Sequence, residues 1–529
     1  MKKRVLAMIM AGAMVFSCGC GSSGGGAAGS SDASSDPAPA ASADVSADVA
    51  ETPDIEGFYI ATISDSNYVY RDDSEEELNM VATWEEFSLV NPSDPTASAE
   101  GSGAALALES YNASVKEKID EFTDSYAEAS GDAYMEDAYY TAEDKGDVVR
   151  FDDEVLSIRD YTYEFTLGAH GMYFFTGYNY DAATGEEIGL SDVIPDTDSL
   201  KEALAAALLE KYDSEYFYSG EDVATDLDVY FTDESVELNF TLGASGITFY
   251  FAPYDIAPYA VGALDVTLPY DSNVVNADYA PEDTDSYVLP VMPNAEMTIP
   301  STGESMICYF EELDSESATY GGTVIIGENN NEIEFADGYG ADAYIVHMGD
   351  KDFLAVNVAG SNDIESLYVY DLSDGKCTQI DTGDEGYGLC EFVHTDPSDF
   401  LMGTRSDMLS TFRAYGIYEF GEDGTYTRTS KWFYNADVYG EDSLPGTLTL
   451  KQDITAQVIL EADSEDSDTR TIEAGTELTI FRTDNNSVVD LLTSDGTIVR
   501  LTVEDGEDCY QTVNGIDIEE LFDGVVFAG

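Results

Sequence analysis

The stretch YEFTLGAHGMYFFTGYNYDAATGEEIGLSDVI, residues 163–194, contains one of only three histidines among 529 residues. Aromatic residues precede the turn LGAHG and follow it in a dense run. Alternation broken by glycines is typical of two strands joined by a turn, so we predict a strand on each side of His170. If His170 is catalytic or binds a metal, the chain is an enzyme or a metalloprotein. If His170 only stabilises the turn, the chain is better explained as a binding module.

The frame Phe-Thr-Leu-Gly-Ala-x-Gly occurs twice, in EFTLGAHGMYFF at 164–175 and in NFTLGASGITFY at 239–250. Ser245 stands in the second copy where His170 stands in the first, so the histidine is optional to the frame. No HxxxH pair or nearby cysteine accompanies His170, and the chain contains no GxSxG elbow. We predict a structural or hydrogen-bonding role for it, and little effect of His170→Ser on fold or activity.

Outward from this stretch, helices and strands are mixed. ALALESYNASVKEKIDEFTDSYAEA at 105–129 and LKEALAAALLEKYDSEYF at 200–217 have helical spacing of apolar residues. VVRFDDEVLSIRDYTYEF, LDVYFT and GALDVTLPY are strand-like. Because the elements do not alternate regularly, residues 52–275 predict an α+β domain rather than a doubly wound sheet.

Four segments in this region resemble the extracellular domain of the RsiV/PdaC family, which lysozyme-sensing anti-sigma factors share with the N-terminal half of peptidoglycan deacetylases. They are Leu167 to Gly171, Asp181 to Gly185, Leu190 to Ile194 and Tyr254 to Gly262. The resemblance implies a sensing or binding domain, which in the anti-sigma factors binds lysozyme. It gives a structural or ligand-contact role to the family-motif turn, which is Gly168, His170, Gly171, Tyr254, Pro258 and Tyr259. The deacetylase's catalytic histidines and paired aspartates have no counterpart here.

The N-terminal residues read as an export signal. Lys2, Lys3 and Arg4 precede a short apolar run that ends in Ser17-Cys18, which resembles a lipobox. We predict a lipoprotein signal peptide at 1–17 and lipidation of Cys18, with Cys20 as the weaker alternative. Residues 18–51 are mostly Gly, Ser, Ala, Asp and Pro, a composition that predicts a disordered tether.

The charge balance is strongly acidic. The chain has 21 Lys and Arg against 107 Asp and Glu, and loss of the three basic signal residues changes the net charge from −86 to about −89. This charge disfavours nucleic acid and anionic membrane surfaces as partners. We therefore expect the chain to contact the membrane only through the lipid on Cys18. It favours basic proteins such as lysozyme, although acidity also serves solubility alone.

Cofactor and metal signatures are missing from the sequence. Cys308, Cys377, Cys390 and Cys509 form no CxxC pair, and no acidic stretch has the spacing of a calcium loop. We therefore predict no metal, no cofactor and no catalytic residue. A Cys377–Cys390 bridge and buried free thiols both remain compatible with the spacing.

Residues 284–440 contain short strands with Gly, Asp and Asn turns. They predict an irregular all-β domain, either propeller-like or a sandwich, in which His347 and His394 are ordinary strand histidines. The order of short strands and turns along residues 446–529 is similar to that of bacterial SH3-like barrels. Asp484, Asp490 and Asp495 are expected to make the surface of that barrel acidic.

These observations predict a multidomain chain on the extracellular face of the cytoplasmic membrane. We expect it to be a binding protein at the cell wall, not an enzyme, that takes lysozyme or a component of peptidoglycan. The alternative is an enzyme or accessory factor acting on wall polymers through a carboxylate pair that sequence cannot identify.

Overall fold

The computed structural model describes residues 55–71, 77–129, 138–233, 235–282, 284–292, 295–314, 319–336, 338–361, 364–383, 387–435, 447–460, 466–505 and 511–527. The predicted signal peptide, the tether, Cys18 and Cys509 lie outside these residues. The described part is multidomain and mostly β, with several sheets that have their own buried cores.

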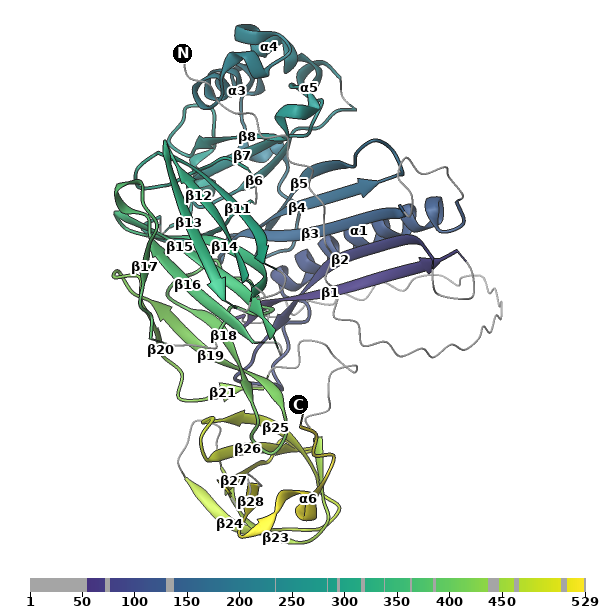
Figure 1. The fold of residues 1–529 in the computed structure, drawn as a ribbon, viewed down its shortest axis with the longest axis vertical. Coiled ribbons are helices and arrows are strands. Elements are labelled where there is room, and N and C mark those ends of the chain that lie inside the picture. Colours follow the sequence, from purple (N-terminus) through teal and green to yellow (C-terminus); the bar gives the residue numbers. More distant parts are fainter. Residues whose placement is uncertain are drawn as a thin grey trace, which may run out of the picture. The chain divides into compact units, whose positions relative to one another are not determined.

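The first sheet has five strands in the order β1-β2-β3-β4-β5. They are β1 (Tyr59–Tyr70), β2 (Leu78–Val90), β3 (Tyr140–Phe151), β4 (Val155–Phe165) and β5 (Met172–Asp181). All neighbours are antiparallel except β2 and β3. A parallel pair needs a crossover, which helix α1 (Gly103–Tyr126) supplies while it covers one face of the sheet (Figure 1).

Helix α1 confirms the helix predicted at 105–129. Ser102 caps its N-terminus, because the serine side chain accepts a hydrogen bond from the Ala105 amide at 3.2 Å. Its buried residues recur at spacings of three and four and pack on the sheet, and they include Leu108, Tyr111, Val115, Ile119 and Phe122. Packing of this apolar stripe positions the five strands.

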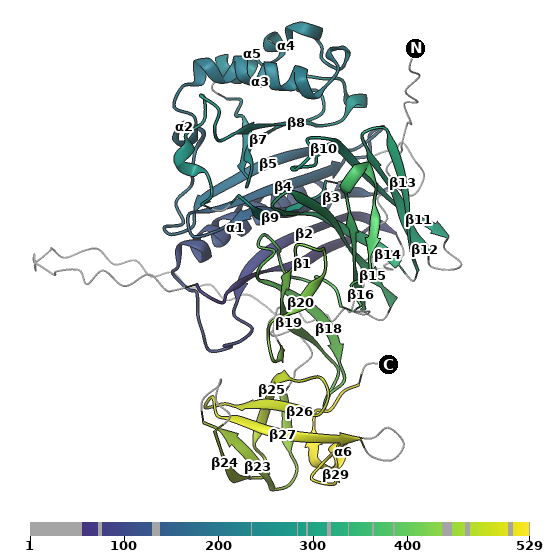
Figure 2. The same ribbon diagram turned by 90° about the vertical axis from the view of Figure 1, so that its left-hand side faces the viewer.

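A smaller sheet follows, made of β6 (Asn239–Leu242), β7 (Gly246–Phe251) and β8 (Leu264–Pro269). Before it come α2 (Leu190–Val193), α3 (Thr197–Lys211), α4 (Val223–Asp226) and α5 (Asp228–Thr232). Helix α3 packs on β8 (Figure 2). The strand predicted at 227–232 is wrong: Val223 and Leu227, four residues apart, are both fully buried in this core, and the segment is helical.

The two copies of the repeat both form hairpins, but not the same hairpin. In the first, Glu164 pairs with Met172 and Leu167 has a φ of 64°. In the second, Leu242 still pairs with Ile247, and the Gly243 amide bonds the Gly246 carbonyl across a tight turn. Ser245 is therefore not in the conformational position of His170, and the repeat does not carry over the turn geometry.

Buried polar side chains join the two sheets. Ser157 donates to the Asn179 side chain at 2.7 Å, and both accept from the Leu242 amide of β6. The Asn179 amide donates to the Phe240 carbonyl at 2.8 Å. Gly177 lies at this contact, where a β-carbon would be 1.7 Å from the Phe240 carbonyl oxygen. Only glycine lets the strands approach so closely.

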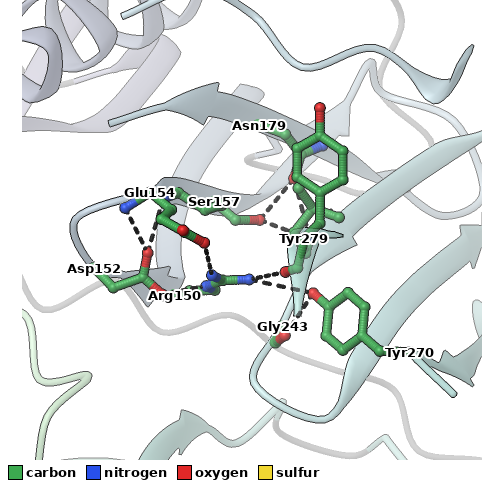
Figure 3. A network of polar contacts seen from close by, with 10 residues as sticks. Arg150, Asp152, Glu154, Ser157, Asn179, Gly243, Tyr270 and Tyr279 are labelled. Atoms are coloured by element: carbon green, nitrogen blue, oxygen red, sulfur yellow. Dashed lines mark hydrogen bonds and ion pairs between the residues drawn. The ribbon is translucent and has the colours of Figure 1, made fainter. Parts of the chain in front are cut away.

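Arg150 provides a second joint between the sheets (Figure 3). Its guanidinium is buried, donates to Asp152 and to the Tyr279 carbonyl at 2.5 Å each, and lies 3.4 Å from the Tyr270 hydroxyl. Tyr270 in turn donates to the Gly243 carbonyl at 2.9 Å. One cation thus holds the β3–β4 connection against the end of the smaller sheet.

The middle region has two sheets that share a core. One is β10 (Met297–Thr298), β11 (Ser305–Asp314), β12 (Thr319–Ile326) and β13 (Asn329–Ala336). The other is β9 (Ser286–Pro290), β14 (Gly338–Met348), β15 (Lys351–Gly360), β16 (Glu365–Asp371) and β17 (Thr378–Ile380). Met306 of one sheet and Leu354 of the other lie in the same buried cluster, an arrangement typical of sandwiches.

The histidines of this region are buried. His347, on β14, contacts Asp352 through Nδ1 at 2.7 Å and packs against the tilted Tyr287 ring, with ring centroids 4.7 Å apart. His394 was predicted on a strand but lies in the connection before β18, with Nε2 3.1 Å from the Leu389 carbonyl. Neither forms part of a metal cluster in the described residues.

The last sheet has 13 strands and continues across the predicted boundary between 440 and 446. It contains β18 (Phe400–Ser406), β19 (Phe412–Phe420), β20 (Tyr426–Arg428), β21 (Phe433–Tyr434), β22 (Thr447–Leu450), β23 (Ile454–Ile459), β24 (Ser467–Ile472), β25 (Glu477–Thr483), β26 (Val488–Thr493), β27 (Ile498–Asp505), β28 (Gln511–Val513), β29 (Ile516–Asp517) and β30 (Phe522–Asp523). The short α6 (Ile518–Leu521) interrupts it. Strand β21 pairs with β25, so both regions share one sheet.

Two expectations for the C-terminal strands are wrong. Among the described residues β24 pairs only with β23, so the strands stay open rather than closing into a barrel. Asp490 is not on the surface: it is fully buried and bonds Arg482 at 2.8 Å and Arg500 at 2.7 Å. Both guanidinium groups also face the Trp432 ring. A buried carboxylate with two arginines was invisible to sequence because the residues are not adjacent.

Candidate binding surface

Two rows of side chains cross the face of the first sheet opposite α1. Residues directly paired across strands point to the same face. The first row is Glu143, Tyr163 and Tyr173, and the second is Lys145, Tyr161 and Phe175. All four rings are half-buried. This face therefore presents aromatic rings beside a carboxylate and an ammonium, which themselves pair at 2.9 Å.

The family-motif turn extends these rows. His170 stacks on Tyr259 with ring centroids 3.9 Å apart, and Tyr254 lies 5.5 Å from Tyr259. The Tyr254 hydroxyl is 3.5 Å from His170 Nε2, although the residues are 84 positions apart in sequence. Tyr259 also contacts Tyr173 edge-on at 6.5 Å. We call His170, Tyr254 and Tyr259, with Tyr161, Tyr163, Tyr173 and Phe175, the aromatic surface.

Backbone contacts fix the rings. Tyr259 donates from its hydroxyl to the Gly171 carbonyl at 2.9 Å, and the Ala263 amide donates to Tyr173. His170 Nδ1 lies 3.0 Å from the same Gly171 carbonyl. Pro258 is exposed and immediately precedes the short 3₁₀ helix Tyr259–Val261, which carries Tyr259. Side chains held by such contacts lose little freedom when a ligand binds.

The glycines of the motif have different uses. A β-carbon on Gly171 would lie 2.3 Å from the Tyr163 ring, so glycine lets that ring pack under the turn. At Gly168 the nearest atom would be 3.7 Å away. The left-handed residue of this turn is Leu167, whose side chain is buried in the core under α1. Neither Gly168 nor Gly171 has a positive φ, so the left-handed step of this turn is made by Leu167 alone among the three residues.

Tyr254 is the most accessible tyrosine of the aromatic surface. Its side chain is 51% exposed and its φ is 78°. A bulky residue with positive φ is strained, and such strain concentrates at functional sites. The Ala257 carbonyl accepts from its amide at 3.1 Å, and the buried Ile256 and Ala257 anchor the turn. The turn thus keeps the Tyr254 side chain exposed to solvent.

Acidic groups surround the tyrosines. Burial and then the Glu143 carboxylate raise the pKa values of Tyr161 and Tyr163, so both hydroxyls remain neutral donors. Further along the same face, burial raises the pKa of Glu85 to about 8, while the Lys145 ammonium acts in the opposite direction. A face of neutral phenols and carboxylates suits ammonium groups and sugar rings better than anions.

A pair of carboxylates does converge, but on the other face of the sheet. Lys118 of α1 bridges Asp144 at 2.7 Å and Asp160 at 2.5 Å, and both aspartates are buried. Tyr111 donates to Asp160 at 2.9 Å, and Thr162 contacts both carboxylates. Burial and the neighbouring Asp160 raise the pKa of Asp144 to about 7. The helix covers this cluster, so its geometry is that of a core ion network.

The buried groups Glu85 and His394 give the free energy of unfolding opposite dependences on pH. Glu85 titrates near 4.5 when unfolded and near 8 when folded, so the folded chain holds an extra proton and loses stability as pH rises between those values. His394 titrates near 6.5 unfolded and near 4 folded because of burial, so stability falls as pH drops through that window. Melting temperatures from pH 4 to 9 test this.

The matched variants for the pH experiment are Glu85→Gln and the exposed Glu186→Gln. Glu85→Gln should flatten the decline between pH 6 and 8, and Glu186→Gln should leave it unchanged. An equal slope in both variants would mean that Glu85 does not couple to folding.

Sequence reasoning named part of this surface and missed the rest. The structure brings His170, Tyr254 and Tyr259 together. Gly171 lets the Tyr163 ring pack under the turn and Pro258 precedes the 3₁₀ turn of Tyr259, whereas Gly168 makes no close contact. Tyr161, Tyr163, Tyr173 and Phe175 were not singled out, although their alternation along the two strands placed them on one face. Within the described residues, no group of three or more His, Cys, Asp or Glu is arranged to hold a metal ion.

These elements define a small α/β unit packed on a five-stranded sheet. Residues 191–271 match the family model of DUF3298, whose description is a protein of unknown function, and form a DUF3298 domain. A DUF3298-family structure from Bacteroides fragilis is similar at 23% identity and a TM-score of 0.29, covering 42% of this chain and 95% of its own. Another, from Pseudomonas aeruginosa PAO1, has 19% identity and a TM-score of 0.28, covering 42% and 97%. The search of curated proteins found no match.

Proposed function

We propose that this chain is an extracellular binding protein whose ligand docks on the aromatic surface. The observation that carries the proposal is the meeting of His170, Tyr254 and Tyr259, from segments 84 positions apart, in one stacked and accessible group. Tyrosine supplies large contact area at low entropic cost and is enriched among residues that dominate binding energy. The ligand itself is a wall component or an exported protein.

Charge favours a basic ligand. The net charge of −86 accelerates encounter with cationic partners, and the Glu143 carboxylate lies on the face that carries the tyrosines. The RsiV/PdaC-type resemblance of residues 52–275 adds lysozyme as a specific candidate. Peptidoglycan is the second, since sugar rings stack on tyrosines.

The location and the remaining modules belong to the same proposal. A lipid on Cys18 anchors the chain outside the membrane, and the open C-terminal strands of residues 446–529 contact the wall. Among the described helices, none is both long enough and apolar enough to cross a membrane. Cys18→Ala should release the protein from membranes in detergent-free fractionation, and unchanged retention would favour Cys20 or an uncleaved signal.

An enzyme acting on wall polymers is the competing class. It would need two carboxylates that a substrate can reach. The converging pair, Asp144 and Asp160, is buried under α1, and both carboxylates contact the Lys118 ammonium. These contacts favour a structural role for the pair, and therefore the binding proposal.

Tyr254→Ala is expected to weaken ligand binding at least about tenfold, because truncation of a central aromatic contact commonly costs 2 kcal/mol or more. Tyr218→Ala is the matched control, since that ring is 54% exposed but lies outside the aromatic surface. Retention of hen lysozyme and of purified wall fragments on the immobilised chain measures the effect. Equal losses in both variants would remove the aromatic surface as the site.

A further inference from the structure

Cys308 lies in the layer between the two middle sheets. It is fully buried on β11, and its direct cross-strand partner on β12 is Val324, which pairs in turn with Asn331 on β13. Because direct partners share a face, these three side chains form one row on the buried side of the sheet. The row points toward the core shared with the neighbouring sheet.

Cys377 is held over the same row by Asn331. The Cys377 amide donates to the asparagine side-chain oxygen at 3.2 Å, and the asparagine side-chain amide donates to the Val324 carbonyl at 3.1 Å. Gly375, two residues earlier, lies against Asn329 and Ile326. The segment 375–377 therefore covers this face, and the half-buried Cys377 packs on the cluster that contains Cys308.

We infer that Cys308 and Cys377, which are free thiols in this structure, are a disulfide-forming pair. The two thiols interact electrostatically. Burial first, and then the neighbouring Cys377 thiol, raises the pKa of Cys308 to about 12. Sequence spacing did not suggest this pair, because its members lie 69 positions apart, and the pair replaces the Cys377–Cys390 bridge considered from the sequence. Cys390 lies in another cluster, with Phe392 and Leu401.

The chemistry is thiol–disulfide exchange with an organic disulfide outside the cell, which follows from the proposed export. The Cys377 thiolate attacks one sulfur of the oxidant and releases the first thiol. The Cys308 thiolate then attacks the Cys377 sulfur of the mixed disulfide and releases the second thiol. The protein loses two hydrogens and two electrons, and the oxidant is reduced to two thiols. Burial raises the pKa of Cys377 to about 12, so exchange is fastest before the core closes.

The test is refolding of the full chain in a mixture of oxidised and reduced glutathione, followed by alkylation without reductant and digestion at acidic residues. We expect a linked peptide that joins Cys308 to Cys377, and a melting temperature several degrees above that of the reduced protein. Cys377→Ser should abolish both changes. Cys390→Ser, the matched control, should retain both.

Two results would overturn the inference. One is alkylation of both Cys308 and Cys377 in the refolded protein while an added small disulfide protein oxidises normally. The other is a linked peptide that joins either residue to a different cysteine. Both readouts are independent of ligand binding, so they do not share an outcome with the test of Tyr254.

Discussion

Asp490→Asn is expected to destabilise the C-terminal sheet by about 3–5 kcal/mol, because it leaves two buried guanidinium groups without their shared carboxylate. Asp490 is fully buried, and the side chains of Arg482 and Arg500 are 2% and 15% exposed. Asparagine has almost the same size, so the change isolates the charge. The large cost reflects the loss of the carboxylate that the two arginines share inside the fold, rather than the net worth of the ion pairs.

Urea unfolding followed by Trp432 fluorescence measures this effect, since both arginines face that ring at 4.8 and 4.9 Å. A Trp84→Phe background removes the other tryptophan of the chain. Asp495→Asn is the control, because Asp495 lies in an exposed turn, where it accepts hydrogen bonds from the Thr493 hydroxyl and the Thr497 amide. Similar midpoints for the two variants would show that Asp490 is not essential to the cluster.

Gly177→Ala is expected to destabilise the chain by about 3 kcal/mol or more. Its β-carbon would lie 1.7 Å from the Phe240 carbonyl oxygen, so β6 has to move away. That movement breaks the bonds of Asn179 and Ser157 to β6 and leaves buried polar groups unpaired. The DUF3298 domain should then open before the first sheet.

Limited proteolysis and hydrogen exchange across 191–271 report this opening. Gly168→Ala is the matched control, because no atom except the His170 carbonyl oxygen, at 3.7 Å, lies within 4 Å of the new methyl group. It should change stability by less than about 0.5 kcal/mol. Equal protection of 191–271 in both variants would contradict the tight approach at Gly177.

Sequence periodicity predicted the local elements well where one face is apolar. Helix α1 and the strands around His170 follow directly from their spacing. Residues 227–232 were mispredicted because VYF favours strands, whereas Val223 and Leu227 gain more by entering the core as helical neighbours. The open C-terminal sheet was also missed, since pairing between distant strands leaves no local signal.

The site was predictable only in part. The motif named His170, Tyr254 and Tyr259, but their stacking depends on contacts between segments far apart in sequence. The Asp490 cluster and the Lys118 network show the same limit, because an acidic residue in sequence looks identical whether it is solvated or buried. Burial and partners, which tertiary structure sets, distinguish the two cases.

The most direct test of the binding proposal is the dissociation constant of the full chain for lysozyme and for wall fragments at 0.05 and 0.3 M salt, compared with its Tyr254→Ala/Tyr259→Ala variant. Cytochrome c serves as a basic protein without the expected shape. If the interface has a specific shape, binding of one of the two ligands should persist at 0.3 M salt, because salt screens charge but not ring contacts. That ligand should also outcompete cytochrome c, and its binding should be lost in the double variant. Retention of all basic proteins alike, vanishing together by 0.3 M salt in both forms of the chain, would contradict the account.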